Sequence, residues 1–214
     1  MIRGALFDMD GLLLDSEGVY ARGIREVMGS LGFTISDDAL RRALGVNQQV
    51  SNAIFAEGNP GYDGPRMHRA LGDWLAAHGY DRRIPLKPGA AEVLPRLAAR
   101  GVRCALVTSS PLSQAQTYLG GAGLMGYFSA VVTGDLKLPS KPAPDVFLYA
   151  AGMLALNIRD CAVLEDSPNG LKAGRAAGAV TVMIPDLIPY GPETAPYCDH
   201  VFHDLTEAEA ALWP

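Results

Sequence analysis

Five short apolar runs are spread along this chain, and they constrain its fold more than any other feature. They cover residues 2–7, 102–107, 130–133, 161–164 and 179–184, and each is followed by polar or glycine-rich residues. Apolar runs of this length are typical of strands that are buried on both faces of a sheet. Segments with helical spacing separate most of them, so we expect an α/β fold in which right-handed crossovers build a parallel sheet.

Residues 15–87 have a different pattern, because they contain no comparable strand run. Apolar positions from Tyr20 to Leu31 recur at helical spacing, and three further helical patterns follow. Four consecutive helices without a strand indicate a helical insertion after the first strand. We therefore predict a core made of residues 1–14 and 88–214, interrupted by a helical cap domain over residues 15–87.

The composition excludes several classes of protein. The chain has 214 residues, is 49% hydrophobic, and carries 18 basic against 23 acidic side chains, a net charge of −5. This apolar content excludes a wholly disordered chain, and the mild acidity argues against nucleic-acid binding. No run approaches the roughly 18 apolar residues of a membrane span, and the three cysteines show no pairing pattern. We expect a cytoplasmic monomer that does not associate with membranes.

Acidic, hydroxyl and cationic side chains follow the predicted strands. In chain order they are Asp8, Asp10, Thr108, Ser109, Lys141, Glu165 and Asp166. The carboxyl ends of parallel strands meet at one edge of a sheet, and ligands bind beyond that edge. We therefore expect four acids, two hydroxyls and one ammonium group to converge on a single site.

Four carboxylates in one place need a cation or bound protons. Two of them about 4 Å apart repel by roughly 4 kcal/mol at an effective dielectric constant near 20. Oxygen ligands of this kind suit Mg²⁺. Thr108, the Ser109 amide and Lys141 can then hold a phosphoryl group. Because phosphoryl transfer depends on positioning and charge neutralisation, Thr108 and Lys141 are also catalytic candidates.

The segment Asp8-Met9-Asp10-Gly11 resembles the first motif of the haloacid dehalogenase (HAD) superfamily, and in particular of the branch that contains β-phosphoglucomutase and small sugar-phosphate phosphatases. The second, third and fourth motifs of that superfamily match Thr108, Lys141 and Glu165-Asp166, in this order. One Asp-x-Asp alone would be weak evidence, whereas four motifs in order are specific. The resemblance implies a doubly wound, Rossmann-like core with an inserted α-helical bundle cap.

The resemblance also implies chemical roles for the acids. Asp8 would be the nucleophile that attacks phosphorus and forms an aspartyl-phosphate. Asp10 would protonate the leaving oxygen and then activate the hydrolytic water. Asp8, the Asp10 carbonyl and Asp166 would hold Mg²⁺, with Glu165 binding through water or orienting Asp166.

The cap is expected to select the substrate. β-Phosphoglucomutases carry an arginine, a lysine and a histidine at the positions that correspond here to Gln48, Pro111 and Tyr20. These departures favour a hydrolase of a small phosphomonoester, such as a sugar phosphate or a nucleotide, over a mutase. Tyr20, Gly45, Asn47 and Gln48 are the candidate substrate residues, and the uncharged polar side chains of Tyr20, Asn47 and Gln48 suit a sugar or nucleoside hydroxyl.

Two alternatives to a phosphatase stay open. The first is a phosphomutase of the β-phosphoglucomutase type. The second is a non-catalytic or phosphorylatable signalling module, because receiver domains also combine aspartates, threonine and lysine on a parallel sheet. Receiver domains are shorter, lack a cap and carry the phosphorylated aspartate on a later strand. The intact motifs favour the enzyme, with a small phosphorylated substrate as its partner.

Overall fold

The computed structural model describes residues 2–43 and 48–214 of the chain. Two of the candidate substrate residues, Gly45 and Asn47, lie outside this described part. Over residues 2–43 and 48–214, no helix combines the length and apolar character that a membrane crossing requires.

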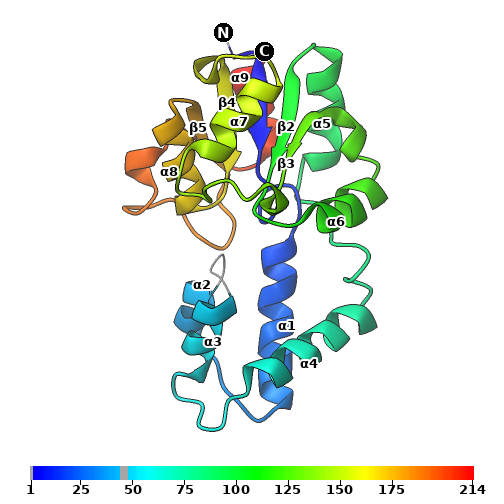
Figure 1. Cartoon of the computed structure of the whole chain (residues 1–214), viewed down its shortest axis with the longest axis vertical. Coiled ribbons are helices and arrows are strands. Elements are labelled where there is room, and N and C mark those ends of the chain that lie inside the picture. Colours follow the sequence, from blue (N-terminus) through cyan, green and yellow to red (C-terminus); the bar gives the residue numbers. More distant parts are fainter. Residues whose placement is uncertain (1, 44–47) are drawn as a thin grey trace. The chain divides into compact units, whose positions relative to one another are not determined.

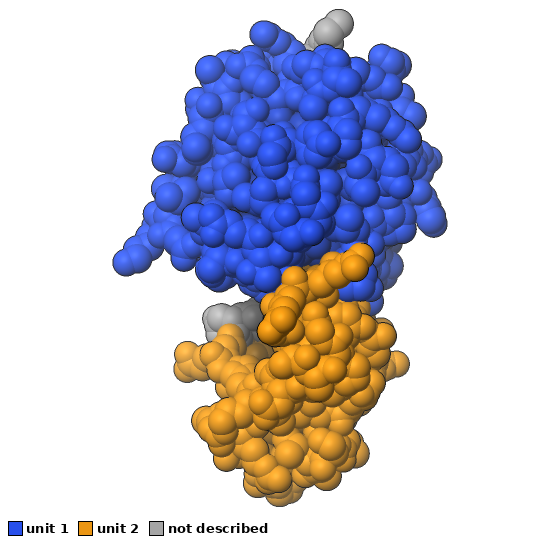
Figure 2. Space-filling model, turned by 90° about the vertical axis from the view of Figure 1, so that its right-hand side faces the viewer, with its two compact units in different colours: residues 1–15, 85–214 blue, residues 16–84 orange. Residues whose placement is uncertain are grey.

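The chain divides into two compact units, which Figure 2 shows in different colours. The core unit comprises Met1–Asp15 and Pro85–Pro214, and the helical unit comprises Ser16–Ile84. The insertion therefore leaves the core shortly after its first strand and returns before its second.

A parallel sheet of six strands forms the centre of the core unit, in the order β3-β2-β1-β4-β5-β6 (Figure 1). The strands are β1 (Gly4–Phe7), β2 (Arg103–Val107), β3 (Phe128–Val132), β4 (Cys161–Glu165), β5 (Val180–Met183) and β6 (His200–Val201). The predicted α/β fold with a parallel sheet is confirmed. The two-residue strand β6 was not predicted, because both of its residues are exposed and form no apolar run.

Helices cover both faces of this sheet. In the core unit they are α5 (Ala90–Ala99), α6 (Leu112–Ala115), α7 (Asp145–Met153), α8 (Pro168–Ala177) and α9 (Leu205–Leu212). The pairs α5–α9 and α7–α8 are each in contact, and they lie on opposite faces of the sheet (Figure 1). Short helical turns connect these elements: η1 (Gln116–Gly120), η2 (Met125–Tyr127), η3 (Gly134–Leu136), η4 (Ile158–Asp160) and η5 (Ala195–Tyr197). Phe147 of α7 packs with Leu6 and Val163 in a fully buried apolar cluster. The strands are therefore shielded on both sides, as their uninterrupted apolar sequences require.

The helical unit consists of two helix pairs. Its helices are α1 (Ser16–Ser30), α2 (Asp37–Ala43), α3 (Gln48–Ala56) and α4 (Gly64–Ala77), and α1 contacts α4 while α2 contacts α3. Gly23 permits the close approach of α1 and α4, because a Cβ at this position would lie 2.8 Å from the Trp74 ring. Met28 and Met67 are almost completely buried and belong to the apolar core of this unit.

The two chain segments that connect the core to the insertion are paired with each other. Leu14 and Leu86 form an isolated antiparallel bridge. The Asp15 amide donates to the Pro85 carbonyl at 2.9 Å, and the Lys87 amide donates to the Leu13 carbonyl at 2.9 Å. We call residues 13–15 and 85–87 the linker ribbon. This ribbon belongs to the core unit and lies close in sequence to the first motif.

Candidate active site

The register of the sheet brings the predicted strand-end residues together. Phe7 pairs with Leu106 on one side and with Leu164 on the other. The residues that follow, Asp8 and Thr108, continue this pattern, because the Asp8 amide donates to the Leu164 carbonyl at 3.1 Å and the Thr108 amide donates to the Val132 carbonyl at 2.9 Å. Backbone hydrogen bonds therefore hold both residues at the carboxyl edge of the sheet. Their side chains are buried, as are those of Glu165 and Asp166.

Lys141 connects two of the predicted acids. It lies in the segment between β3 and α7, and its side chain is 8% exposed. Its Nζ is 2.5 Å from Asp8 Oδ1 and 2.6 Å from Glu165 Oε1, and it also donates to the Val107 carbonyl at 2.9 Å. An ammonium group has three donors, and here each has an acceptor. Two ion pairs thus connect the loop after β3 to the ends of β1 and β4.

Three buried acids lie close together here, and two of them, Asp8 and Glu165, bind the ammonium group. One carboxylate oxygen from each of Asp8, Glu165 and Asp166 lies within 4.8 Å of the other two, and we call these residues the acidic cluster. Burial raises the pKa of Asp8 to about 8, although Lys141 beside it opposes this change. Burial by itself lowers the pKa of Lys141, but the carboxylates of Asp8 and Glu165 outweigh it and raise that pKa. The lysine is therefore charged, and all three acids can be ionised together only if a further cation joins them.

The donor set of the cluster fits a hard divalent cation. It consists of carboxylate oxygens alone, which are the ligands that Mg²⁺ and Ca²⁺ prefer. A buried excess of negative charge is costly unless a cation or a proton neutralises it. The acidic cluster could therefore hold a metal ion, and its three residues lie at the ends of β1 and β4.

Two glycines leave room for the acidic cluster. A Cβ at Gly11 would overlap the Asp166 carboxylate, and the φ of Gly11 is +80°, which disfavours other residues. A Cβ at Gly170, in the first turn of α8, would overlap the Glu165 carboxylate. Gly11 belongs to the first motif, whereas nothing in the sequence pattern singled out Gly170.

Ser167 orients Glu165, which sequence reasoning did not foresee. The Ser167 hydroxyl donates to Glu165 Oε2 at 2.9 Å and accepts from the Gly170 amide at 3.1 Å, so it also forms the N-cap of α8. Glu165 thus has Lys141 on one oxygen and Ser167 on the other. Because both of its oxygens are engaged, Glu165 has a fixed orientation beside Asp166.

The Asp10 side chain has a different partner from those of the acidic cluster. Ser110 Oγ donates to Asp10 Oδ2 at 2.7 Å, and the Ser110 amide donates to Thr108 Oγ1 at 3.0 Å. Ser110 is the last residue of the Thr-Ser-Ser run after β2, and it was not among the predicted site residues. Ser109, the exposed residue between Thr108 and Ser110, carries the amide that was predicted to bind phosphate.

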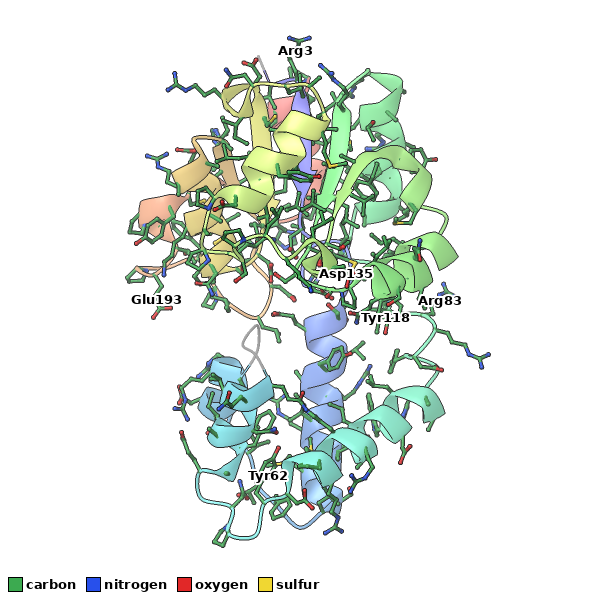
Figure 3. All side chains as sticks on the ribbon, in the orientation of Figure 1. Arg3, Tyr62, Arg83, Tyr118, Asp135 and Glu193 are labelled. Atoms are coloured by element: carbon green, nitrogen blue, oxygen red, sulfur yellow. The ribbon has the colours of Figure 1, made fainter. Side chains whose placement is uncertain are left out.

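The loop after β3 is tied to the loop after β2. Asp135, on η3, accepts from the Leu112 amide at 2.7 Å at the start of α6; Figure 3 labels this side chain. A Cβ at Gly134 would overlap the Ser109 carbonyl, so the two loops are in close contact. These contacts support the segment that carries Thr108 and Ser109.

The predicted substrate residues belong to the other unit. Tyr20 lies on α1, and Gln48 is the first residue of α3. Within the core unit the structure brings Asp8, Lys141, Glu165 and Asp166 together, and Ser110 links Asp10 to Thr108.

Comparisons with known proteins agree with this arrangement. A family model described as haloacid dehalogenase-like hydrolase matches residues 2–178, a range that contains every strand-end candidate. The chain is 34% identical to hexitol phosphatase B of Escherichia coli K12 over 188 residues, which cover 86% of this chain and 84% of that protein. It is 29% identical to a phosphorylated carbohydrates phosphatase of Thermotoga maritima over 211 residues, or 99% of this chain and 90% of that protein.

A solved structure extends the likeness to three dimensions. The structure of a HAD family hydrolase from Deinococcus radiodurans R1, with bound phosphate and sodium, matches this chain with a TM-score of 0.84. The two are 26% identical, and the match covers 99% of this chain and 95% of the other.

Proposed function

This chain belongs to the haloacid dehalogenase-like hydrolases, and from that premise we propose that it releases phosphate from a small sugar phosphate through an aspartyl-phosphate on Asp8. The family predicted from the four motifs is confirmed, and so is the assignment to the phosphoric monoester hydrolases. The observation that carries the finer proposal is the acidic cluster with its shared ammonium group. It joins a candidate nucleophile, a candidate metal site and a phosphate-binding cation within one buried network.

We propose Mg²⁺ as the cofactor. Asp8, Asp166 and the backbone carbonyl of Asp10 would hold it, with Glu165 binding it or orienting Asp166. When bound, it supplies positive charge that lets an anionic nucleophile approach an anionic phosphate. The oxygen-only donor set of the acidic cluster supports this assignment.

The chain's own residues then carry the two half-reactions. In the first, an Asp8 carboxylate oxygen forms a bond to phosphorus while the bond from phosphorus to the ester oxygen breaks, and Asp10 donates a proton to that oxygen. In the second, Asp10 removes a proton from a water molecule that attacks the aspartyl-phosphate, so that Asp8 is regenerated and phosphate leaves. Lys141, Thr108 and the Ser109 amide bind the phosphoryl oxygens.

The helical unit is proposed to act as the cap that selects the substrate. Tyr20 and Gln48 are its described candidates for contact with the substrate, and Gly45 and Asn47 belong to the same proposal. A sugar phosphate is favoured because two relatives are named hexitol phosphatase B and phosphorylated carbohydrates phosphatase. A monomeric state and a cytoplasmic location stay predictions from the sequence.

The test is phosphate release from a panel of hexitol phosphates, hexose phosphates and nucleotides, with and without Mg²⁺. We expect turnover that requires Mg²⁺, stops with a chelator, and is lost in Asp8→Asn. A wild-type protein that releases no phosphate from any member of the panel would contradict the proposal. Efficient isomerisation of β-glucose 1-phosphate in the presence of a bisphosphate activator would instead assign the mutase alternative.

A further inference from the structure

Asp186 has a buried carboxylate oxygen that the proposed mechanism does not use. It lies three residues beyond the end of β5, at the same edge of the sheet as the acidic cluster, and its side chain is 8% exposed. Its Oδ1 accepts from Lys87 Nζ at 2.5 Å. Its Oδ2 is buried and has no hydrogen-bond partner among the residues that the structure describes.

The unpartnered oxygen points toward the acidic cluster. A Cβ built on Gly11 would lie 3.3 Å from Asp186 Oδ2 and would overlap the Asp166 carboxylate. The two acids therefore face the same glycine of the first motif. One carboxylate oxygen of Asp166 lies within 4.8 Å of one from Asp186. Asp166 therefore lies close both to the other members of the acidic cluster and to Asp186.

Lys87 binds the other carboxylate oxygen of Asp186. Its amide donates to the Leu13 carbonyl in the linker ribbon, so its backbone is fixed beside the first motif. Its side chain is 19% exposed, and the ion pair is largely shielded from water. The ion pair gives Oδ1 of Asp186 a partner and leaves Oδ2 without one in the described part of the chain. A buried carboxylate oxygen without a partner costs free energy unless a ligand binds it.

We propose that Asp186 is a positioning residue of the cation site, whose free oxygen adds a fourth carboxylate to the acidic cluster and raises its affinity for a divalent cation. This inference rests on the metal site assigned under the proposed function. Lys87 holds Asp186 in place through the other oxygen. The competing explanation is that Lys87 and Asp186 form only a structural ion pair between the linker ribbon and the loop after β5.

The two explanations predict different effects for the two halves of the ion pair. If the pair is only structural, Asp186→Asn and Lys87→Met remove the same interaction and should change cation binding equally. If Asp186 acts on the cation, Asp186→Asn should weaken binding about tenfold or more, as is usual for residues that support metal ligands. Lys87→Met also removes a positive charge, which by itself favours a cation nearby, so its affinity should change by less than about threefold.

The experiment measures the affinity of the full chain for Mn²⁺ alone, from the loss of the free-ion signal in electron paramagnetic resonance, with Mg²⁺ as competitor. Asp160→Asn is the matched control, because it removes one carboxylate at the opposite edge of the sheet, just before β4. Asp186→Glu keeps the charge and should bind Mn²⁺ more tightly than Asp186→Asn does. Thermal unfolding of each variant establishes that the protein is folded.

Each outcome decides between the explanations. A selective loss in Asp186→Asn, with Lys87→Met and Asp160→Asn near wild type, supports the proposal. Wild-type affinity in Asp186→Asn overturns it, and so does an equal loss in Asp186→Asn and Lys87→Met. A wild-type protein that fails to bind Mn²⁺ would refute the metal site of the proposed function itself. If Asp186→Asn does not fold, a loss of Mn²⁺ affinity of about tenfold or more in Lys87→Met overturns the inference.

Discussion

Replacing Lys141 by methionine should destabilise the core more than any other single loss of charge that we consider. The variant keeps the length of the side chain and removes the ammonium group from between Asp8 and Glu165. Both carboxylates then stay buried without their common partner, since the side chains of Asp8 and Glu165 are 11% and 1% exposed.

The magnitude follows from the two ion-pair distances. Pairs at 2.5 and 2.6 Å attract by roughly 6 kcal/mol each at an effective dielectric constant of 20, before the cost of desolvation. Taking the three charged groups out of water offsets much of this gain. Removal of one partner from a buried pair typically costs about 3–5 kcal/mol, because an uncompensated charge remains. We expect a loss of this size in the free energy of unfolding.

The assay is urea unfolding of Lys141→Met in the presence of a chelator, followed by circular dichroism. Lys137→Met is the control, because Lys137 is an exposed lysine in the same interval between β3 and α7. Its effect should stay within about 0.5 kcal/mol. A Lys141→Met variant no less stable than the Lys137→Met control would refute the reasoning, because the buried charges would then need no lysine.

Two further variants test other parts of the core. Ser110→Ala removes the hydroxyl that donates to Asp10, and it should lower kcat by about 10- to 100-fold without changing Mn²⁺ affinity. An unchanged pH–rate profile would contradict the role of Ser110 as the partner of Asp10. Asp204→Ala removes the N-cap of α9 and should cost about 1 kcal/mol at neutral pH. Hydrogen bonds from the Thr206 side chain and the Glu207 amide lower the pKa of Asp204 in the folded protein. The stabilisation is therefore fully present at a pH above the pKa of an unfolded aspartate, and it is lost as the pH falls through the lowered pKa of the folded state. A difference between Asp204→Ala and wild type that persists in strong acid would rule this out.

The convergence of the main site residues could be predicted from the sequence for a geometric reason. Asp8, Thr108 and Glu165 each end or follow a strand buried on both faces, and parallel strands deliver such residues to one edge. Lys141 could be placed at the same edge, although it is 133 residues from Asp8. Its simultaneous pairing with Asp8 and Glu165 could not be predicted, because it depends on side-chain rotamers.

The residues that sequence reasoning missed carry no periodic pattern. Asp186 follows a proline, a sequence that is typical of turns in general and does not indicate a site. Its partner Lys87 is 99 residues away in the chain. Ser110 is one of three consecutive hydroxyl residues, and only the fold reveals which one faces Asp10. Gly170 lies in the first turn of a helix, where its need to be small depends on the position of Glu165. Each of these roles arises from tertiary contacts between distant segments.

The nucleophilic role of Asp8 is the central claim, and the most direct measurement is the site of covalent phosphorylation. The Asp10→Asn variant should still accept phosphate from a sugar phosphate that the wild-type enzyme hydrolyses. It should release this phosphate very slowly, because it lacks the base that activates water. Acid quenching followed by peptide mass spectrometry should then find phosphate on Asp8 of this variant and none in Asp8→Asn. Phosphate on another residue, or substrate hydrolysis by Asp8→Asn at the wild-type rate, would contradict the account.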